Sequence, residues 1–295
     1  MTTTPTTLIA WIDVAREQKK AVPHFNVSTI DMLYAVLDAQ SEVCTESGQT
    51  VPLCVGCAEG ERDWIGEKTI VEILHSKQVS LNLPIFCNAD HTYSVERALR
   101  AIDAGYDCVV VDFAEKSYDE NVSAIQSVIA YRNEHAPNTL VEAELGFIGS
   151  GSQIKETVPP GVSELTMTKP NEAFDFVGIT GADMLAPSVG NVHGLIKSGK
   201  PRLHPTRVAE IAQVVPNTPL VLHGGSGSTD DDFLAVIDAG ISMIHISSEL
   251  RNAYRTAIVE SLNTSTDLAP YKYLKPGYEA VKQIAKNRIK LFWKV

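Results

Sequence analysis

A regular alternation of short apolar runs with longer segments of helical periodicity constrains the fold of this chain most strongly. The apolar runs predict strands, and the segments between them predict helices. Near-continuous apolar strands are typical of a parallel sheet that is covered on both faces. The predicted strands cover residues 21–27, 51–56, 83–88, 108–112, 139–145, 183–189, 218–222 and 241–247, and the predicted helices cover about 29–47, 60–80, 93–104, 117–135, 170–180, 205–215, 229–239 and a segment from 249.

Eight strand–helix units in a chain of 295 residues favour a closed (β/α)8 barrel, the TIM barrel, which typically needs about 250 residues. An open doubly wound sheet is the alternative. No Gly-x-Gly-x-x-Gly sequence follows the first strand, which counts against a dinucleotide-binding sheet. We therefore expect one α/β barrel domain over residues 1–295, with an extra N-terminal helix at 8–20 and a C-terminal helical extension from about 277.

Two connections of this predicted barrel, 146–169 and 190–204, are long and rich in glycine and proline. Loops of that length in a compact domain are usually lids or binding loops. We expect both to contribute to a binding site.

The net charge of the chain limits the kinds of molecule that it can bind as its main partner. A net charge of −11 argues against nucleic acid or an anionic membrane as the main partner. No apolar run approaches the roughly 20 residues of a membrane span. The five cysteines lack the spacing of a disulfide framework, which indicates reduced thiols. Together these features predict a cytoplasmic protein.

Three histidines follow three of the predicted strands and are the candidate metal ligands. His91, His193 and His223 all lie where a strand ends. A barrel gathers the carboxyl ends of its strands around one axis, and three imidazoles with one open position are a common catalytic zinc site. Any one of them alone would be explained as a hydrogen-bonded loop residue. We expect the remaining histidines, His24, His75, His135 and His204, to be structural; His245 is considered below.

Asp90 directly precedes the first of these ligands and is the candidate catalytic residue. A carboxylate beside a metal-bound substrate can take a proton from a hydroxyl group or from carbon. The simpler alternative is that Asp90 caps the helix that begins near Tyr93.

The loops after the last two strands are the candidate phosphate site. Many barrels bind phosphate in the loops after strands seven and eight, where glycines expose backbone N–H groups near a helix N-terminus. A tight turn explains the glycines equally well. Lys197 could add positive charge. The candidate residues of these loops are Gly224, Gly225, Ser226, His245, Ser247 and Ser248.

Two carboxylates alternate along the fifth predicted strand. Glu142 and Glu144 share one face of that strand, which we take to be the barrel interior. Buried carboxylates are costly unless they are paired or lie on a metal. They therefore support the metal site or bind a second metal, and an internal salt bridge is the alternative.

In this order, the motifs of the chain resemble the class II, metal-dependent fructose- and tagatose-bisphosphate aldolases. The resemblance covers most of the chain. The motifs that carry it are Phe25-Asn26-Val27, Asp90-His91, Ala101-Ile-Asp-Ala-Gly105, Val111-Asp112, Asp119-Glu-Asn121, Val141-Glu-Ala-Glu-Leu-Gly146, Gly190-Asn-Val-His-Gly194, Leu222-His-Gly-Gly-Ser-Gly227, Glu249-Leu-Arg251 and Tyr271-Lys-Tyr-Leu-Lys-Pro276.

The resemblance implies the chemistry of the site. The three strand-end histidines would hold one Zn²⁺ per subunit, with Asp112 as a further support or second-metal residue. Asp90 would act as acid/base on the C4 hydroxyl of a phosphorylated ketose, which is cleaved reversibly through a zinc-stabilised enediolate. The phosphate of the ketone fragment would bind Gly194, Gly224 and Ser226, with Asn26 and Lys197 nearby. Members of the family often bind a monovalent cation, Na⁺ or K⁺, and form homodimers or homotetramers.

Several substrate-facing positions depart from the pattern of that family. Where Asn-x-x-Thr is usual, this chain has His245-Ile-Ser-Ser248. Ala58 aligns with a usual serine, and Phe113 and Ala114 replace a usual glycine and serine. The glutamate that transfers a proton from the mobile loop has no clear match, and Glu156 is only a candidate. We therefore expect aldol chemistry with an altered substrate preference, because direct contacts decide which substrate is rejected.

Two other functions remain open at this point. One is a different metal-dependent reaction on the same barrel, such as epimerisation or hydrolysis. The other is a non-catalytic subunit that stabilises a true aldolase. The complete set of three histidines argues against a non-catalytic subunit, because a site that has lost its activity should first lose a metal ligand.

Overall fold

The protein is described here by a computed structural model, which covers residues 5–149, 151, 153–159, 161–197 and 202–295. Eight parallel strands close into a barrel in the order β1-β10-β9-β7-β5-β4-β3-β2. The closed barrel confirms the predicted TIM-barrel fold and excludes the open sheet. The strands are β1 (Val22–Asn26), β2 (Leu53–Cys57), β3 (Ile85–Thr92), β4 (Cys108–Val111), β5 (Leu140–Leu145), β7 (Met184–Pro187), β9 (Leu220–Leu222) and β10 (Ile241–Ile246).

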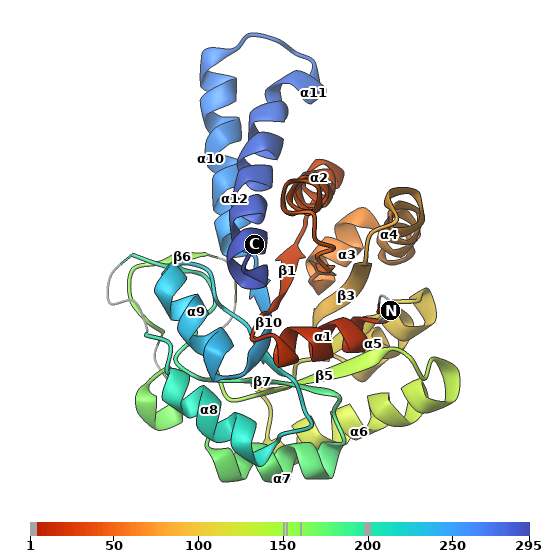
Figure 1. The fold of residues 1–295 in the computed structure, drawn as a ribbon, viewed down its shortest axis with the longest axis vertical. Coiled ribbons are helices and arrows are strands. Elements are labelled where there is room, and N and C mark those ends of the chain that lie inside the picture. Colours follow the sequence, from red (N-terminus) through yellow and green to blue (C-terminus); the bar gives the residue numbers. More distant parts are fainter. Residues whose placement is uncertain (1–4, 150, 152, 160, 198–201) are drawn as a thin grey trace.

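The helices surround this barrel (Figure 1), and their apolar residues are buried in one core with those of the strands. Most of them begin and end close to the predicted residues, because serine or threonine caps their first turn and glycine ends several of them. The predicted N-terminal helix is present as α1 (Leu8–Glu17). The others around the barrel are α2 (Ile30–Ser47), α3 (Glu59–Ile65), α4 (Glu67–Leu81), α5 (Val95–Ala104), α6 (Tyr118–His135), α7 (Pro170–Thr180), α8 (Pro205–Val214) and α9 (Asp230–Ala239).

The prediction of one continuous helix over 60–80 was wrong. Gly66 separates α3 from α4 with a φ of 102°, a value that no helix residue adopts. Its N–H bonds to the carbonyl of Arg62 and closes α3, and the same residue is the N-cap of α4. A single glycine in an apolar periodic segment does not reveal such a break in the sequence.

The C-terminal extension consists of three helices. α10 (Ser248–Thr264), α11 (Pro270–Tyr273) and α12 (Lys275–Trp293) follow the last strand, and α10 and α12 rise side by side away from the barrel (Figure 1). α12 packs along α2, and its last turn returns to the barrel. There Trp293 contacts Trp11 of α1 with the two ring centroids 5.9 Å apart.

The two long connections meet in a small parallel sheet that the sequence did not predict. It consists of β6 (Ile154–Lys155) and β8 (Leu195–Ile196). A 3₁₀ turn at Glu164–Thr166 follows β6. Parts of both connections, residues 150, 152, 160 and 198–201, lie outside the described residues. The pairing ties the two connections to each other where the strands β5 and β7 end.

Within the part of the chain that the structure describes, none of the helices combines the length and the apolar character that a bilayer crossing requires.

Candidate metal centre and active site

His91 lies at the carboxyl end of β3, and its ring is fixed by two carboxylates, one directly after β4 and one on β5. Its Nδ1 is 2.9 Å from Oδ2 of Asp112, which directly follows β4, and 3.5 Å from Oε2 of Glu144 on β5. Nδ1 therefore carries a proton, and Nε2 is the atom that could bind a metal. The residue has a φ of 41°, which is rare outside glycine and typical of functional positions.

His223 follows β9, is fully buried and faces His91. Its Nε2 lies 2.5 Å from Oε1 of Glu142, so Nε2 carries the proton and Nδ1 is left as the metal-binding atom. That Nδ1 is 3.2 Å from Nε2 of His91. Two imidazole nitrogens that each bind zinc at about 2.0–2.1 Å in tetrahedral geometry lie about 3.3 Å apart. The two rings are thus spaced as ligands of one ion.

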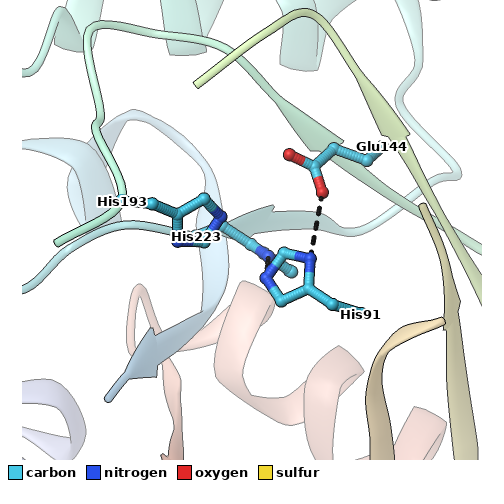
Figure 2. A group of neighbouring side chains, drawn as sticks. All are labelled: His91, Glu144, His193 and His223. Carbon is cyan, nitrogen blue, oxygen red and sulfur yellow. Dashed lines mark hydrogen bonds and ion pairs between the residues drawn. The ribbon is translucent and has the colours of Figure 1, made fainter. Parts of the chain in front are cut away.

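His193 completes the group from the connection after β7 (Figure 2). Its backbone N–H bonds to the carbonyl of Ile148 at 2.9 Å, and its own carbonyl accepts from Nζ of Lys155 at 3.0 Å. Its Nε2 is buried and has no hydrogen-bond partner among the described residues. Leaving such an atom unpaired costs about 1–3 kcal/mol, which a metal bond would offset. Together with Glu144 of β5, the three imidazoles offer one ligand atom each within 4.8 Å of one another.

The charged groups around the three histidines and Glu144 favour the binding of a cation. Burial lowers the pKa of His91, but Asp90, Asp112 and Glu144 outweigh it and raise that pKa to about 10. Burial, and then Asp112, raises the pKa of Glu144 to about 8. Burial, and then His91, holds the pKa of His193 well below its usual value. The acidic groups that stabilise a proton on His91 would also stabilise a divalent ion that displaces it, and His193 stays neutral and able to bind that ion.

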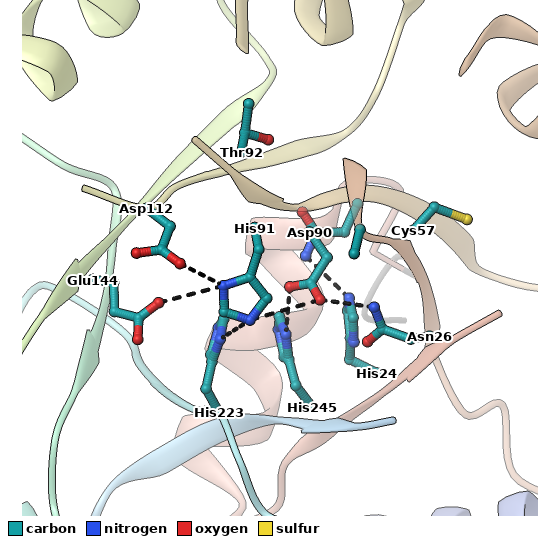
Figure 3. Close-up of polar contacts among 12 residues, drawn as sticks. His24, Asn26, Cys57, Asp90, His91, Thr92, Asp112, Glu144, His223 and His245 are labelled. Atoms are coloured by element: carbon teal, nitrogen blue, oxygen red, sulfur yellow. Dashed lines mark hydrogen bonds and ion pairs between the residues drawn. The ribbon is translucent and has the colours of Figure 1, made fainter. Parts of the chain in front are cut away.

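Asp90 lies beside the three histidines, and both its oxygens are held (Figure 3). Oδ2 accepts a hydrogen bond from Nδ2 of Asn26 on β1 at 2.7 Å, and Oδ1 lies 3.1 Å from Nδ1 of His245 on β10. Burial raises the pKa of Asp90, but His91 and His245 outweigh it and hold that pKa well below the usual value. Asp90 is therefore an oriented carboxylate that can accept a proton.

A cavity of about 500 Å³ opens above this carboxylate. Most of the predicted substrate residues line it, but Lys197 and Gly225 do not. Nζ of Lys197 instead pairs with Glu156 at 2.6 Å, and both of these side chains are largely exposed. Gly225 lies against Phe233 and Ile244, so its small size serves packing. The predicted residues that line the cavity are Asn26, Asp90, His91, Asp112, Glu144, His193, Gly194, Gly224, Ser226, His245, Ser247 and Ser248.

Two glycines let the loops around the cavity approach one another closely. Gly194 has a φ of 93°, and a Cβ there would lie 2.7 Å from the carbonyl oxygen of Gln153. Gly224 has a φ of 59°, and a Cβ there would lie 2.7 Å from the carbonyl carbon of Val192. Only glycine allows this approach of backbone to backbone. Ser247 Oγ, which is buried without a partner among the described residues, belongs to a residue of the same cavity wall.

Glu61 and Arg251 are two site residues that sequence reasoning missed. Glu61, on α3, is buried and accepts hydrogen bonds from Asn26 Nδ2 at 3.3 Å and from Arg251 Nη2 at 2.5 Å. Arg251 lines the cavity, so a line of contacts runs from the cavity wall through Glu61 and Asn26 to Asp90. Nothing in the sequence distinguishes Glu61 from the exposed acids of an amphipathic helix; only Arg251 lay in a motif already singled out.

Comparisons with known proteins point to one family of enzymes and to the same fold. The sequence model of the family described as "Fructose-bisphosphate aldolase class-II" matches residues 6–295. The chain is 34% identical over 282 residues to the fructose-bisphosphate aldolase of Staphylococcus aureus, with 94% of this chain and 93% of that protein covered. It is 32% identical over 285 residues to that of Geobacillus stearothermophilus, with 95% and 94% covered. The crystal structure of the YdjI aldolase from Escherichia coli K12 superposes with a TM-score of 0.80 at 26% identity, covering 98% of this chain and 97% of that one.

Proposed function

Because this chain belongs to the class II fructose-bisphosphate aldolase family, we propose that it is a zinc-dependent aldolase that reversibly cleaves a phosphorylated ketose into a dihydroxyacetone-phosphate-like ketone and an aldehyde. The observation that carries the proposal is the convergence of three imidazoles from three strand ends beside Asp90, whose two oxygens are both held. The single domain, the cytoplasmic location, the monovalent cation and the homo-oligomeric state stay predictions.

His91, His193 and His223 would hold the zinc ion, which would act as a Lewis acid on the ketone carbonyl. The protein's own residues prepare this site. Asp112 and Glu142 accept the ring N–H groups of His91 and His223, so each ring presents its other nitrogen. These contacts orient the ligands before a metal binds.

Asp90 would act as the general base in the cleavage direction. It would take the proton of the C4 hydroxyl, after which the bond between C3 and C4 breaks and the aldehyde is released. The electron pair of that bond would stay on the ketone fragment as an enediolate, which takes a proton from solvent at C3 to give the ketone. Asn26 and His245 hold the carboxylate in one orientation for this step. In the reverse direction the protonated Asp90 would return the proton to the new hydroxyl group.

The phosphate of the ketone fragment would bind at Gly194, Gly224 and Ser226, with Ser247 and Ser248 on the neighbouring loop. Backbone N–H groups and hydroxyl groups are the usual ligands of phosphate. Glu156, the candidate for proton transfer at C3, is exposed, lies outside the cavity and pairs with Lys197. We therefore assign it no role.

A panel of substrates tests the function. We expect the purified protein, loaded with zinc, to release a triose phosphate from at least one ketose phosphate, and a chelator to abolish the release. A coupled dehydrogenase assay measures the release from fructose and tagatose bisphosphates and from ketose monophosphates. Zinc-loaded protein that cleaves none of them, in either direction, would contradict the proposal.

His245→Asn is expected to shift substrate preference toward the ordinary ketose bisphosphates. Asparagine places a donor close to the position of His245 Nδ1, so the contact with Asp90 is kept, while the rest of the ring is removed from the cavity wall. Changing a direct contact of this kind typically alters the ratio of kcat/KM values by about 10- to 200-fold. The measurement is kcat/KM for each member of the panel, with His75→Asn, on the exposed side of α4, as the control. An unchanged profile would remove His245 from the determinants of specificity.

A further inference from the structure

His24 is a buried imidazole inside the barrel, and it lies directly against His245. The two rings are stacked with centroids 3.5 Å apart and planes 6° from parallel. His223 lies on the other side of His245, with centroids 4.1 Å apart and planes 27° from parallel. Figure 3 shows His245 between the two rings. Both faces of His245 are therefore covered by imidazoles.

This stack is not a second metal site. His24, Asp90 and His245 do offer ligand atoms close to one another. A metal binds an imidazole nitrogen along its lone pair, which lies in the plane of the ring. Two nearly parallel planes 3.5 Å apart share no nearby point at which one ion could bind both rings. The arrangement instead restricts the rotation of His245.

A glycine on the neighbouring strand makes room for the ring of His24. Gly56 on β2 is its neighbour, and a Cβ at that position would lie 2.2 Å from Cε1 of His24. Nε2 of His24 lies 3.0 Å from Nδ2 of Asn88 on β3, which sets the rotation of the ring. His24 is thus held by two strands while its face supports His245.

We propose that His24 is a positioning residue, which holds the ring of His245 so that Nδ1 donates to Oδ1 of Asp90. The proposal rests on the proposed function, in which Asp90 is the general base. His24 itself does not line the cavity and touches no reacting atom. We expect it to act on Asp90 through its stacking contact with His245.

Two substitutions of His24 that differ in size test whether it positions His245. His24→Ala leaves a space beside His245, and His24→Gln keeps a group that can bond to Asn88 but lacks the ring. We expect both to lower kcat by about 10- to 100-fold, since misplacing a catalytic group by about 1 Å costs on the order of 100-fold. KM and the zinc content should stay unchanged. The control is His75→Ala, on the exposed side of α4.

A double-mutant cycle separates positioning from a merely structural role. In the His245→Asn background the stacking partner is gone, so adding His24→Ala should lower kcat by less than about twofold, because coupled residues are not additive. A general loss of stability would lower activity by the same factor in both backgrounds. An equal factor, or wild-type kcat in both His24 variants, would overturn the proposal.

A measurement that does not depend on catalysis tests the positioning role separately from the aldolase function. In ¹⁵N-labelled protein, the Nδ1 proton of His245 should exchange with solvent more slowly than in His24→Ala, because the ring is held toward Asp90. Unchanged exchange would overturn the positioning role even if the enzyme is an aldolase. Suppose that exchange is faster in His24→Ala but the wild type cleaves no ketose phosphate. That result would support the positioning role and refute the aldolase function.

Discussion

Asp90→Asn is expected to lower kcat for ketose cleavage by about 10²- to 10⁴-fold, the usual contribution of a positioned general base. Asparagine has the shape of the carboxylate but cannot accept the proton of the C4 hydroxyl. The carboxylate form is present at neutral pH, because His91 and His245 outweigh burial and keep the pKa of Asp90 well below its usual value. Release of triose phosphate, measured at saturating substrate, gives the change in kcat.

Two further measurements make this result specific. The zinc content of Asp90→Asn should equal that of the wild type, because in the proposed site three other residues would hold the metal. The matched control is Asp63→Asn on α3, where the carboxylate is exposed and pairs with Arg97; this variant should keep wild-type kcat. Retention of more than about a tenth of the activity in Asp90→Asn would exclude Asp90 as the base, given the usual size of that effect.

His193→Ala is expected to weaken zinc binding by more than about 100-fold and to remove activity with it. His193 Nε2 is buried with no hydrogen-bond partner among the described residues, and a bond to zinc would satisfy it. Asp112→Asn, which changes only the partner of His91 Nδ1, should weaken binding by about 10- to 100-fold, as is usual for residues that orient a ligand. Competition with a chromophoric chelator measures both affinities.

Metal removal gives the complementary result. Dialysis of the wild type against a chelator should abolish cleavage, and added Zn²⁺ should restore it. His135→Ala, on the exposed end of α6, is the control and should bind zinc as the wild type does. Full activity in metal-free wild type, or zinc affinity unchanged in His193→Ala, would refute the metal centre.

The outline of the site was predictable because it depends on where strands end. In a parallel barrel all carboxyl ends lie at one mouth, so His91, His193 and His223 converge in any barrel with these strands. The alternation of Glu142 and Glu144 likewise placed both on the interior face. The structure adds what each one contacts: Glu142 meets His223, and Glu144 lies near His91.

Other residues of the site depend on contacts that no local pattern reveals. Glu61 resembles an exposed helix residue in the sequence, yet it is buried and holds Asn26 and Arg251. Lys197 had the charge expected of a phosphate ligand, but its ammonium group pairs with Glu156 outside the cavity. In each case the partner lies far away along the chain, so only the folded arrangement decides it.

The sequence by itself determined the alternating strands and helices and the strand ends that carry the histidines, and it favoured the closed barrel, because apolar periodicity depends on local spacing along the chain. Only the tertiary structure decided that His24 lies on His245, that Gly66 divides a helix, and that β6 pairs with β8. Ring orientation, cavity walls and loop pairing arise from close packing between distant segments, and the side chain at one position does not encode which neighbour it will meet.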